Sequence, residues 1–327
     1  MAFRARCLAL ALALVATSSS AFAQAPDAGH EAIEWDYMFP IWGDKVAERG
    51  IKLPLPFGLG LNYAFVDQPI EISRVAVGVN DSEMVDLSNL IEFDDVNSKV
   101  HALNLRADLW LLPFLNVYAM GNYAIQAETQ VSIAQPFSFD VTATQPGVGA
   151  GFGGTLAGGA WGFFGTVDIN WTWNKMEKLD DPVGTRLITP RVGKNLGKLG
   201  GIEFIVWGGA MQQQIESKTQ GQIHLNELGS DAEGGKFQDD LVNWYEGLPP
   251  SRQALVRGLV GRLDGDGDPV IRYDLHKAVK HPWNLLVGTE IGLTEAWRLR
   301  GEFGFINRTQ LILGINYRFG GFTGASL

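Results

Sequence analysis

Six segments of the chain alternate apolar and polar residues with a period of two. In residues 103–111 the odd positions hold leucine or alanine, and the even positions hold Asn104, Arg106, Asp108 and Trp110. The same alternation recurs in residues 57–65, 163–173, 285–291, 297–305 and 311–319. Successive side chains of a β-strand point to opposite faces, so each segment predicts a strand with one apolar face.

The length of these segments favours strands that cross a membrane. Each has about ten residues, as a tilted transmembrane strand requires, whereas the strands of a soluble sandwich usually have about five or six. Aromatic residues lie near many segment ends, as in the interfacial girdles of transmembrane barrels. They are Trp110, Tyr123, Trp161, Trp173, Trp283 and Trp297. We therefore expect an all-β fold, an antiparallel transmembrane β-barrel, rather than a soluble β-sandwich.

The N-terminus has the pattern of a secretory signal peptide. Arg4 and Arg6 precede an apolar stretch from Leu8 to Ala16, and Ala21-Phe22-Ala23 forms a small-x-small site, which predicts cleavage after Ala23. The apolar stretch is too short to span a bilayer. Cleavage would remove Cys7, the single cysteine, and so exclude disulfides from the mature chain. The net charge of −10 argues against a nucleic-acid partner.

The last alternating segment carries a further signal. Gly314, Tyr317 and Phe319 form a G-x-x-Y-x-F pattern that resembles the terminal-strand signature of bacterial outer-membrane β-barrel proteins. The resemblance extends, at the level of class, over residues 57–319, and residues 320–327 continue past the usual terminal aromatic. It implies a Gram-negative outer-membrane location, with outer-membrane lipid and the barrel assembly machinery as partners. No specific family is indicated.

The connections between segments predict the number of strands. Barrels of this class keep short turns on the periplasmic side and long loops outside. That rule is satisfied, with one tight exception at Asn307-Arg308, by ten strands starting near residues 57, 100, 115, 148, 161, 185, 202, 283, 297 and 310. The long connections are then 67–99, 126–147, 175–184 and 214–282. Residues 69–79 and 270–277 also look extended, either as strand extensions or as a further pair that would make twelve strands.

Five regions follow from this reading. They are a signal peptide (1–23), a periplasmic N-terminal segment (24–56), the barrel (57–319), the long external loop within it (214–282) and a C-terminal extension (320–327). We expect the N-terminal segment to pack at the barrel rim or plug its mouth, with partner binding as the alternative. The external loop predicts a short helix at Phe237–Tyr245 and another starting at Pro249-Pro250-Ser251. It would cap the barrel or recognise an extracellular ligand.

The polar face of the strands predicts the lining of the lumen. Four basic and four acidic residues lie on it, so the interior is expected to be neutral and mutually paired. A barrel of ten strands is narrow compared with open porins of about sixteen, which favours a plugged or narrow lumen over free conduction. The predicted lumen-lining residues are Arg106, Asp108, Asp168, Glu290, Arg298, Arg300, Glu302 and Arg318.

Motifs for catalysis or metal binding are weak. Asp264, Asp266 and Asp268 resemble the start of a calcium loop, but Pro269 and Leu275 stand where that loop needs glycine and glutamate. A solvated acidic turn is the better interpretation, and no cofactor is expected. Asp274 and His276, with the Asp94-Asp95 pair, are only superficially compatible with a barrel protease. We attribute the glycine run at 147–154 to tight strand packing rather than to phosphate binding.

Taken together, the sequence predicts a monomeric, non-enzymatic outer-membrane barrel with a structural or ligand-binding role through its long external loop. The alternative is a narrow channel or transporter for small solutes that uses the lumen charges. A barrel hydrolase is the third hypothesis.

Overall fold

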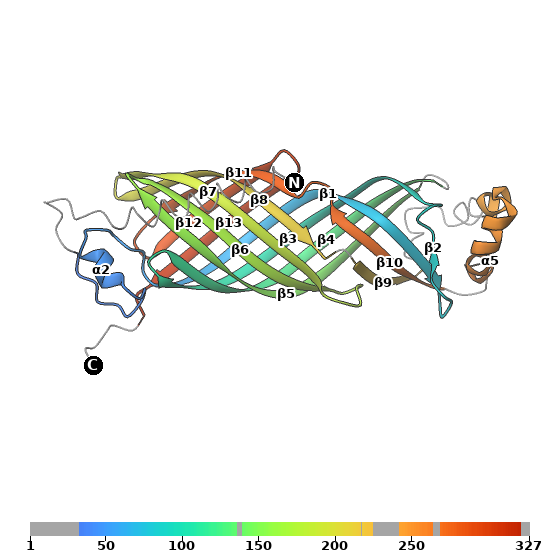
Figure 1. Cartoon of the computed structure of the whole chain (residues 1–327), viewed down its shortest axis with the longest axis horizontal. Helices are drawn as coiled ribbons and strands as arrows, with labels where there is room; N and C mark the ends of the chain where they lie inside the picture. Colours follow the sequence, from blue (N-terminus) through green and yellow to red (C-terminus); the bar gives the residue numbers. More distant parts are fainter. Residues whose placement is uncertain (1–32, 136–138, 217, 225–241, 264–268, 322–327) are drawn as a thin grey trace, which may run out of the picture.

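The structure is a computed structural model, and it describes residues 33–135, 139–216, 218–224, 242–263 and 269–321. Ten antiparallel strands form a closed barrel (Figure 1), which confirms the predicted fold class and strand number. The predicted signal peptide and the acidic turn at 264–268 lie outside the described residues. The barrel strands are β1 (Phe57–Val79), β3 (Glu92–Leu112), β4 (Leu115–Gln135), β5 (Phe139–Ala160), β6 (Phe163–Met176), β7 (Val183–Leu199), β8 (Ile202–Ile215), β11 (Trp283–Gly292), β12 (Trp297–Phe305) and β13 (Thr309–Phe319).

The first and last strands close the barrel. β1 pairs with β13 from Phe57↔Phe319 to Asp67↔Thr309, and the two terminal phenylalanine rings stack with centroids 5.5 Å apart. We call the end where β1 begins and β13 ends the base, and the opposite end the top. Because β1 and β13 pair with each other, the sheet has no exposed edge strand between Phe57 and Asp67.

The outer surface carries exposed apolar side chains around the whole circumference. Exposed examples lie on tall and short strands alike: Leu105 on β3, Phe152 on β5, Val192 on β7, Leu285 on β11 and Leu313 on β13. A soluble protein rarely exposes so large an apolar surface, and the pattern matches the lipid-facing band of a transmembrane barrel. Among the described residues, no helix is long and apolar enough to cross a membrane.

The wall of the barrel is uneven in height. β1, β3, β4 and β5 have between 21 and 23 residues, whereas β11, β12 and β13 have between 9 and 11. Above the short strands the wall is continued by β9 (Lys218–His224) and β10 (Val270–Val279), a pair that we call the upper hairpin. β10 pairs with the upper half of β1, from Ile70↔Val279 to Val79↔Ile271. A bridge between Leu179 and Gly221 joins β9 to the β6–β7 connection.

This arrangement corrects three predicted loops. Residues 67–99 and 126–147 are not long connections, because most of each belongs to β1, β3, β4 or β5. The predicted loop 214–282 contributes the upper hairpin to the wall. Residues 69–79 are the upper part of β1, so the twelve-strand alternative is wrong for the closed barrel. The prediction of loops at 67–99 and 126–147 failed because the apolar face of these strands changes from outside to inside above the membrane band.

Both ends of the barrel are covered by segments outside the sheet. At the base, a short helix α2 (Gly43–Ala47) belongs to the N-terminal segment, whose Ile41 amide donates to the Leu111 carbonyl over 3.0 Å. At the top, α5 (Pro250–Leu263) begins where the sequence predicted a helix start. Its Val256 and Leu259 pack against Val75 of β1 and its neighbours. Figure 1 shows α2 and α5 at opposite ends of the molecule. Residues 242–247 are also helical, and the rest of the predicted helix at 237–245 lies outside the described residues.

Candidate functional site in the lumen

A continuous cavity of about 1880 Å³ runs through the barrel. Near the base it is lined by Trp35, Tyr37 and Leu55 of the N-terminal segment, and near the top by Trp244. The part of the N-terminal segment that the structure describes therefore lies at the mouth of the cavity at the base. Between these ends the lining changes from charged near the base to apolar near the top.

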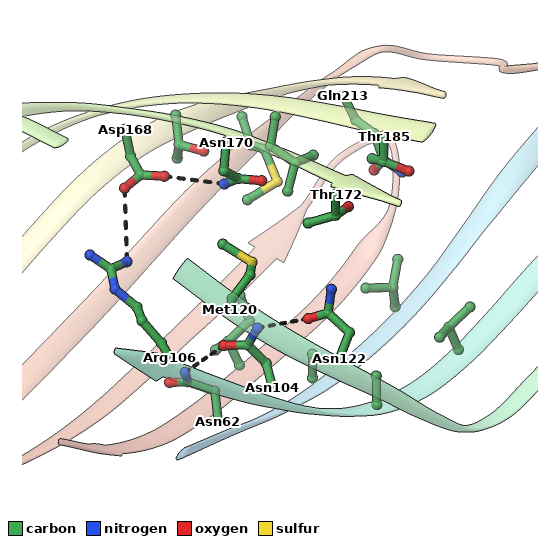
Figure 2. A pocket seen from close by; sticks show the side chains of 18 of the residues that line it. Asn62, Asn104, Arg106, Met120, Asn122, Asp168, Asn170, Thr172, Thr185 and Gln213 are labelled. Atoms are coloured by element: carbon green, nitrogen blue, oxygen red, sulfur yellow. Dashed lines mark hydrogen bonds and ion pairs between the residues drawn. The ribbon is translucent and has the colours of Figure 1, made fainter. Parts of the chain in front are cut away.

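A row of asparagines crosses the tilted strands inside the barrel (Figure 2). Asn62 on β1 donates to Asn104 on β3 over 3.1 Å, and Asn104 donates to Asn122 on β4 over 2.7 Å. Asn122 then reaches across β5 to Asn174 on β6 over 3.3 Å. The intervening position on β5 is Gly149, and a Cβ there would collide with the Asn174 amide. We call Asn62, Asn104, Asn122 and Asn174 the asparagine row.

The charged residues of the cavity wall lie on the base side of this row, in a region that we call the lower lumen. Each of the four predicted acids lies within ion-pair distance of one of the four predicted bases. The distances are 4.0 Å for Arg106–Asp168, 3.0 Å for Arg318–Asp108, 2.9 Å for Arg298–Glu290 and 3.0 Å for Arg300–Glu302. All of these residues except Glu302 line the cavity itself.

Glu302 is the most buried member of this group. Its side chain has no exposed surface. Arg191 on β7 donates to both carboxylate oxygens, from Nε over 2.7 Å and from Nη2 over 3.0 Å. Trp207 on β8 adds a donor at 2.8 Å, and Arg300 adds one at 3.0 Å. A carboxylate that accepts a bidentate arginine and two further donors holds three strands of the lower lumen together.

Asp168 is the centre of a second cluster. It accepts hydrogen bonds from the Tyr118 hydroxyl over 2.8 Å, from Thr155 over 2.6 Å and from Asn170 over 3.3 Å. Tyr118 reaches Asp168 from β4 across β5, at Gly153, where a Cβ would lie 2.5 Å from the phenolic oxygen. The glycine run thus has the packing role that its sequence predicted. The guanidinium of Arg106 lies 3.5 Å from the centre of the Tyr118 ring.

Two charged residues that pair with predicted lumen residues were not predicted from the sequence. Arg191 pairs with Glu302, and Glu203 accepts from Arg298 over 2.9 Å. They lie on β7 and β8, where the alternation is unclear, because Pro190 interrupts the first segment and the second carries apolar residues on both faces. On the inner face of β8 the Trp207 ring occupies the space that a Cβ at Gly288 would need, and its ring nitrogen donates to Glu302.

The polarity of the strands inverts above the membrane band. On β1, β3 and β4 the outward apolar side chains end at Phe65, Leu103 and Ile125. The next outward row is Asp67–Lys99–Glu128, whereas the inward row beside it is Val66–Val100–Ala127. On β4 the inversion coincides with a one-residue register shift that leaves Ile125 unpaired with β3.

The part of the cavity above the inversion is mainly apolar. We call it the upper chamber, and it is lined by inward residues of β1, β3, β4, β8 and the upper hairpin, together with Leu179 of the β6–β7 connection and Trp244. Its apolar lining comprises Val66, Ile70, Ile72, Val75, Val77, Phe93, Val96, Val100, Val131, Ile133, Leu179, Ile215, Trp244, Ile271 and Leu275. An apolar cavity with a few polar groups is the usual form of a small-molecule site.

The three residues of the terminal-strand pattern lie on β13. Tyr317 is exposed, and its ring packs against that of Trp297 with centroids 4.8 Å apart. Phe319 stacks on Phe57. Gly314 faces Asn62, whose amide occupies the space that a Cβ would need. Their role in recognition by an assembly machinery stays a prediction.

The structure does not bring the weak catalytic and metal candidates together among the residues it describes. In the part of the chain that the structure describes, no group of three or more histidine, cysteine or acidic side chains is placed so that it could hold a metal ion. Asp274 is engaged with Gln220 and Lys218, at 2.8 Å and 3.8 Å. Asp94 and Asp95 are exposed. Asp264, Asp266 and Asp268 lie outside the described residues.

Comparison with known proteins gives similarity of fold alone. No protein-family model matches the chain, and no curated protein sequence matches it. Among solved structures, the β domain of the Bordetella autotransporter BrkA has 9% identity and a TM-score of 0.39, over 81% of this chain and 100% of that one. The outer-membrane protein OprG of Pseudomonas aeruginosa has 10% identity and a TM-score of 0.38, over 82% and 98%. These matched structures are bacterial outer-membrane β-barrels, and the chain is assigned to no single family.

Proposed function

We propose that this protein is a non-enzymatic outer-membrane barrel that binds a small ligand in its lumen and does not conduct freely. The base would face the periplasm and the top the cell exterior, because the described strands join through short turns at the base. The proposal retains the predicted ligand-binding role. It moves the binding site from the long loop alone to the chamber that the loop helps to build.

The observation that carries the proposal is the paired charge in the lower lumen. Glu302 on β12 and Arg191 on β7 are separated in the sheet by β11 and β8, yet they join through two hydrogen bonds. Their side chains therefore occupy the lumen in front of these two strands. Arg318 donates to the Leu55 carbonyl over 2.9 Å and so ties the N-terminal segment to the same region. Breaking buried ion pairs of this kind costs several kcal/mol per pair, which opposes spontaneous opening.

Conductance tests the closed state. The full-length protein, refolded into a planar bilayer, should show no discrete current steps while its heat-modifiable gel mobility reports a folded barrel. A saturable signal from an apolar fluorescent probe, excited by energy transfer from the tryptophans, should accompany the silent bilayer. Regular current steps would overturn the closed state, and a folded protein that binds no apolar probe would overturn the ligand-binding role.

One observation favours the alternative of a narrow channel. The cavity is continuous from Leu55 to Trp244, so small movements of the N-terminal segment would suffice to open a path. In that case the current steps should change in size on Arg298→Gln or Arg300→Gln, because these side chains line the path.

A further inference from the structure

The charge of the upper chamber is one-sided. The acidic residues that line the cavity, within the described part of the chain, are Glu34, Asp108, Asp168, Glu203, Glu290 and Glu295, and all belong to the lower lumen or the base. The charged residues that line the upper chamber are Lys178 and Lys277. An otherwise apolar site that offers only cations is complementary to an anionic group on an apolar molecule.

Of these two lysines, Lys277 is the one whose ammonium is available to bind an anionic group. Lys178 has interactions of its own, whereas the ammonium of Lys277 has no hydrogen bond or ion pair with any residue that the structure describes. It lies on β10 opposite Ile72 of β1, above the point where the outward apolar side chains of β1 end. Burial lowers the pKa of Lys277 from its ordinary value of 10.5, since no neighbouring carboxylate compensates the charge. A bound anion would supply that compensation.

A second polar group without a partner lies beside it. Thr219 on β9 is 5% exposed, lines the cavity, and its hydroxyl has no hydrogen-bond partner among the described residues. Thr219 pairs with Leu275, which puts it on the diagonal from Lys277 on the inward face of the upper hairpin. Diagonal neighbours are about 7–8 Å apart, within reach of a long side chain. One hydroxyl and one ammonium together form a donor set for a single small anion.

We propose that the upper chamber binds a single-chain amphiphile with a carboxylate head, of the fatty acid class. Its acyl chain lies among the apolar side chains of β1, β3 and β4, and its carboxylate meets Lys277 and Thr219. A phosphate head would call for more donors than this site offers, and usually for arginine. The inference rests on the proposed ligand-binding function and names its substrate class.

The test is a displacement assay on the full chain in phosphatidylcholine nanodiscs, with dansyl-labelled undecanoate as the probe. Unlabelled dodecanoate should displace the probe at least tenfold better than dodecanol, and dodecyl phosphate should displace it less well than dodecanoate. Equal displacement by dodecanol would overturn the head-group site while leaving the binding function intact. Equal displacement by dodecyl phosphate would overturn the choice of a carboxylate. A folded barrel that binds no probe of either kind would overturn the proposed function itself.

Variants locate the head group. Lys277→Gln should weaken dodecanoate binding about tenfold and leave dodecanol binding unchanged, because it removes a charge-assisted hydrogen bond. Thr219→Val should weaken dodecanoate binding about fivefold. The matched control is Lys280→Gln, since Lys280 lies three positions further along, is exposed, and is absent from the cavity lining. Lys277→Arg should retain binding. Equal affinities for Lys277→Gln and Lys280→Gln, with both proteins folded, would refute the assignment.

Discussion

The buried carboxylate of Glu302 allows a sharp test of what holds the lower lumen together. Glu302→Gln keeps the size of the side chain and removes its charge. In the native protein the carboxylate accepts four hydrogen bonds, two from Arg191, one from Trp207 and one from Arg300. The amide of glutamine has one acceptor oxygen and turns an NH₂ group toward a guanidinium, so Arg191 loses its bidentate partner.

The expected loss follows from the burial of the group. The Glu302 side chain is 0% exposed and that of Arg191 is 12% exposed, so neither charge is solvated in the folded barrel. Removing one partner of such a pair costs about 3–5 kcal/mol. We expect a loss near the lower limit, about 3 kcal/mol, because Arg300 is 28% exposed and recovers some water.

The free energy of unfolding is measured by urea titration in phosphatidylcholine vesicles, with tryptophan emission and heat-modifiable mobility as two probes of one transition. Glu295→Gln is the control, because Glu295 pairs with Lys52 at the base while both side chains are more than 60% exposed (68% and 64%). Exposed pairs contribute less than about 1 kcal/mol. If Glu302→Gln lies within about 1 kcal/mol of the control, the reasoning from burial is refuted.

Two further perturbations test other parts of the molecule. Gly153→Ala should destabilise the barrel by about 1–3 kcal/mol, because its Cβ would lie 2.5 Å from the Tyr118 hydroxyl. The control in the same urea titration is Gly121→Ala, which should be near neutral because its Cβ meets nothing within 4 Å. Equal effects of the two substitutions would contradict the packing role of Gly153. Hydrogen bonds from the hydroxyl and amide of Ser88 hold the pKa of Asp86 at about 2, below its ordinary value of 3.8. The stabilisation that they give is therefore complete above about pH 4 and is lost as the pH falls toward 2. An NMR titration of the Asp86 carboxyl should show the low midpoint and Ser88→Ala should raise it; a native midpoint at 3.8 would contradict this.

The sequence predicted the membrane part of the fold well because lipid and lumen impose opposite demands on alternate residues. Leu105 and Arg106 cannot exchange faces without placing a charge in lipid, so the period of two is unambiguous there. Above the membrane band β4 still alternates apolar and polar residues, but beyond Ile125 the apolar residues at odd positions point inward instead of outward. An outward apolar face was assumed throughout the sequence analysis, which therefore predicted that these strands end too early.

The lumen was predictable only where the alternation was clean. The eight predicted charges lie on strands with regular patterns, whereas Arg191 and Glu203 lie on β7 and β8, whose inward faces also carry apolar side chains. Pairing across the lumen depends on the curvature of the closed sheet, which the alternation of one strand does not encode. The upper chamber was not predicted for a related reason. Lys277 lies in residues 270–277, which the pattern predicted to be extended without giving their position in the barrel.

The double pairing of β1 has a consequence for assembly. Its lower half accepts β13, ending at Asp67↔Thr309, and its upper half accepts β10, starting at Ile70↔Val279. The two partners thus meet end to end along one edge. If β13 slipped upward by two residues, Thr309 would face Pro69, and the strand would run into the end of β10. The upper hairpin thereby restricts the register in which β13 can pair with β1. The same edge of β1 therefore determines both the correct closure of the barrel and the shape of the upper chamber.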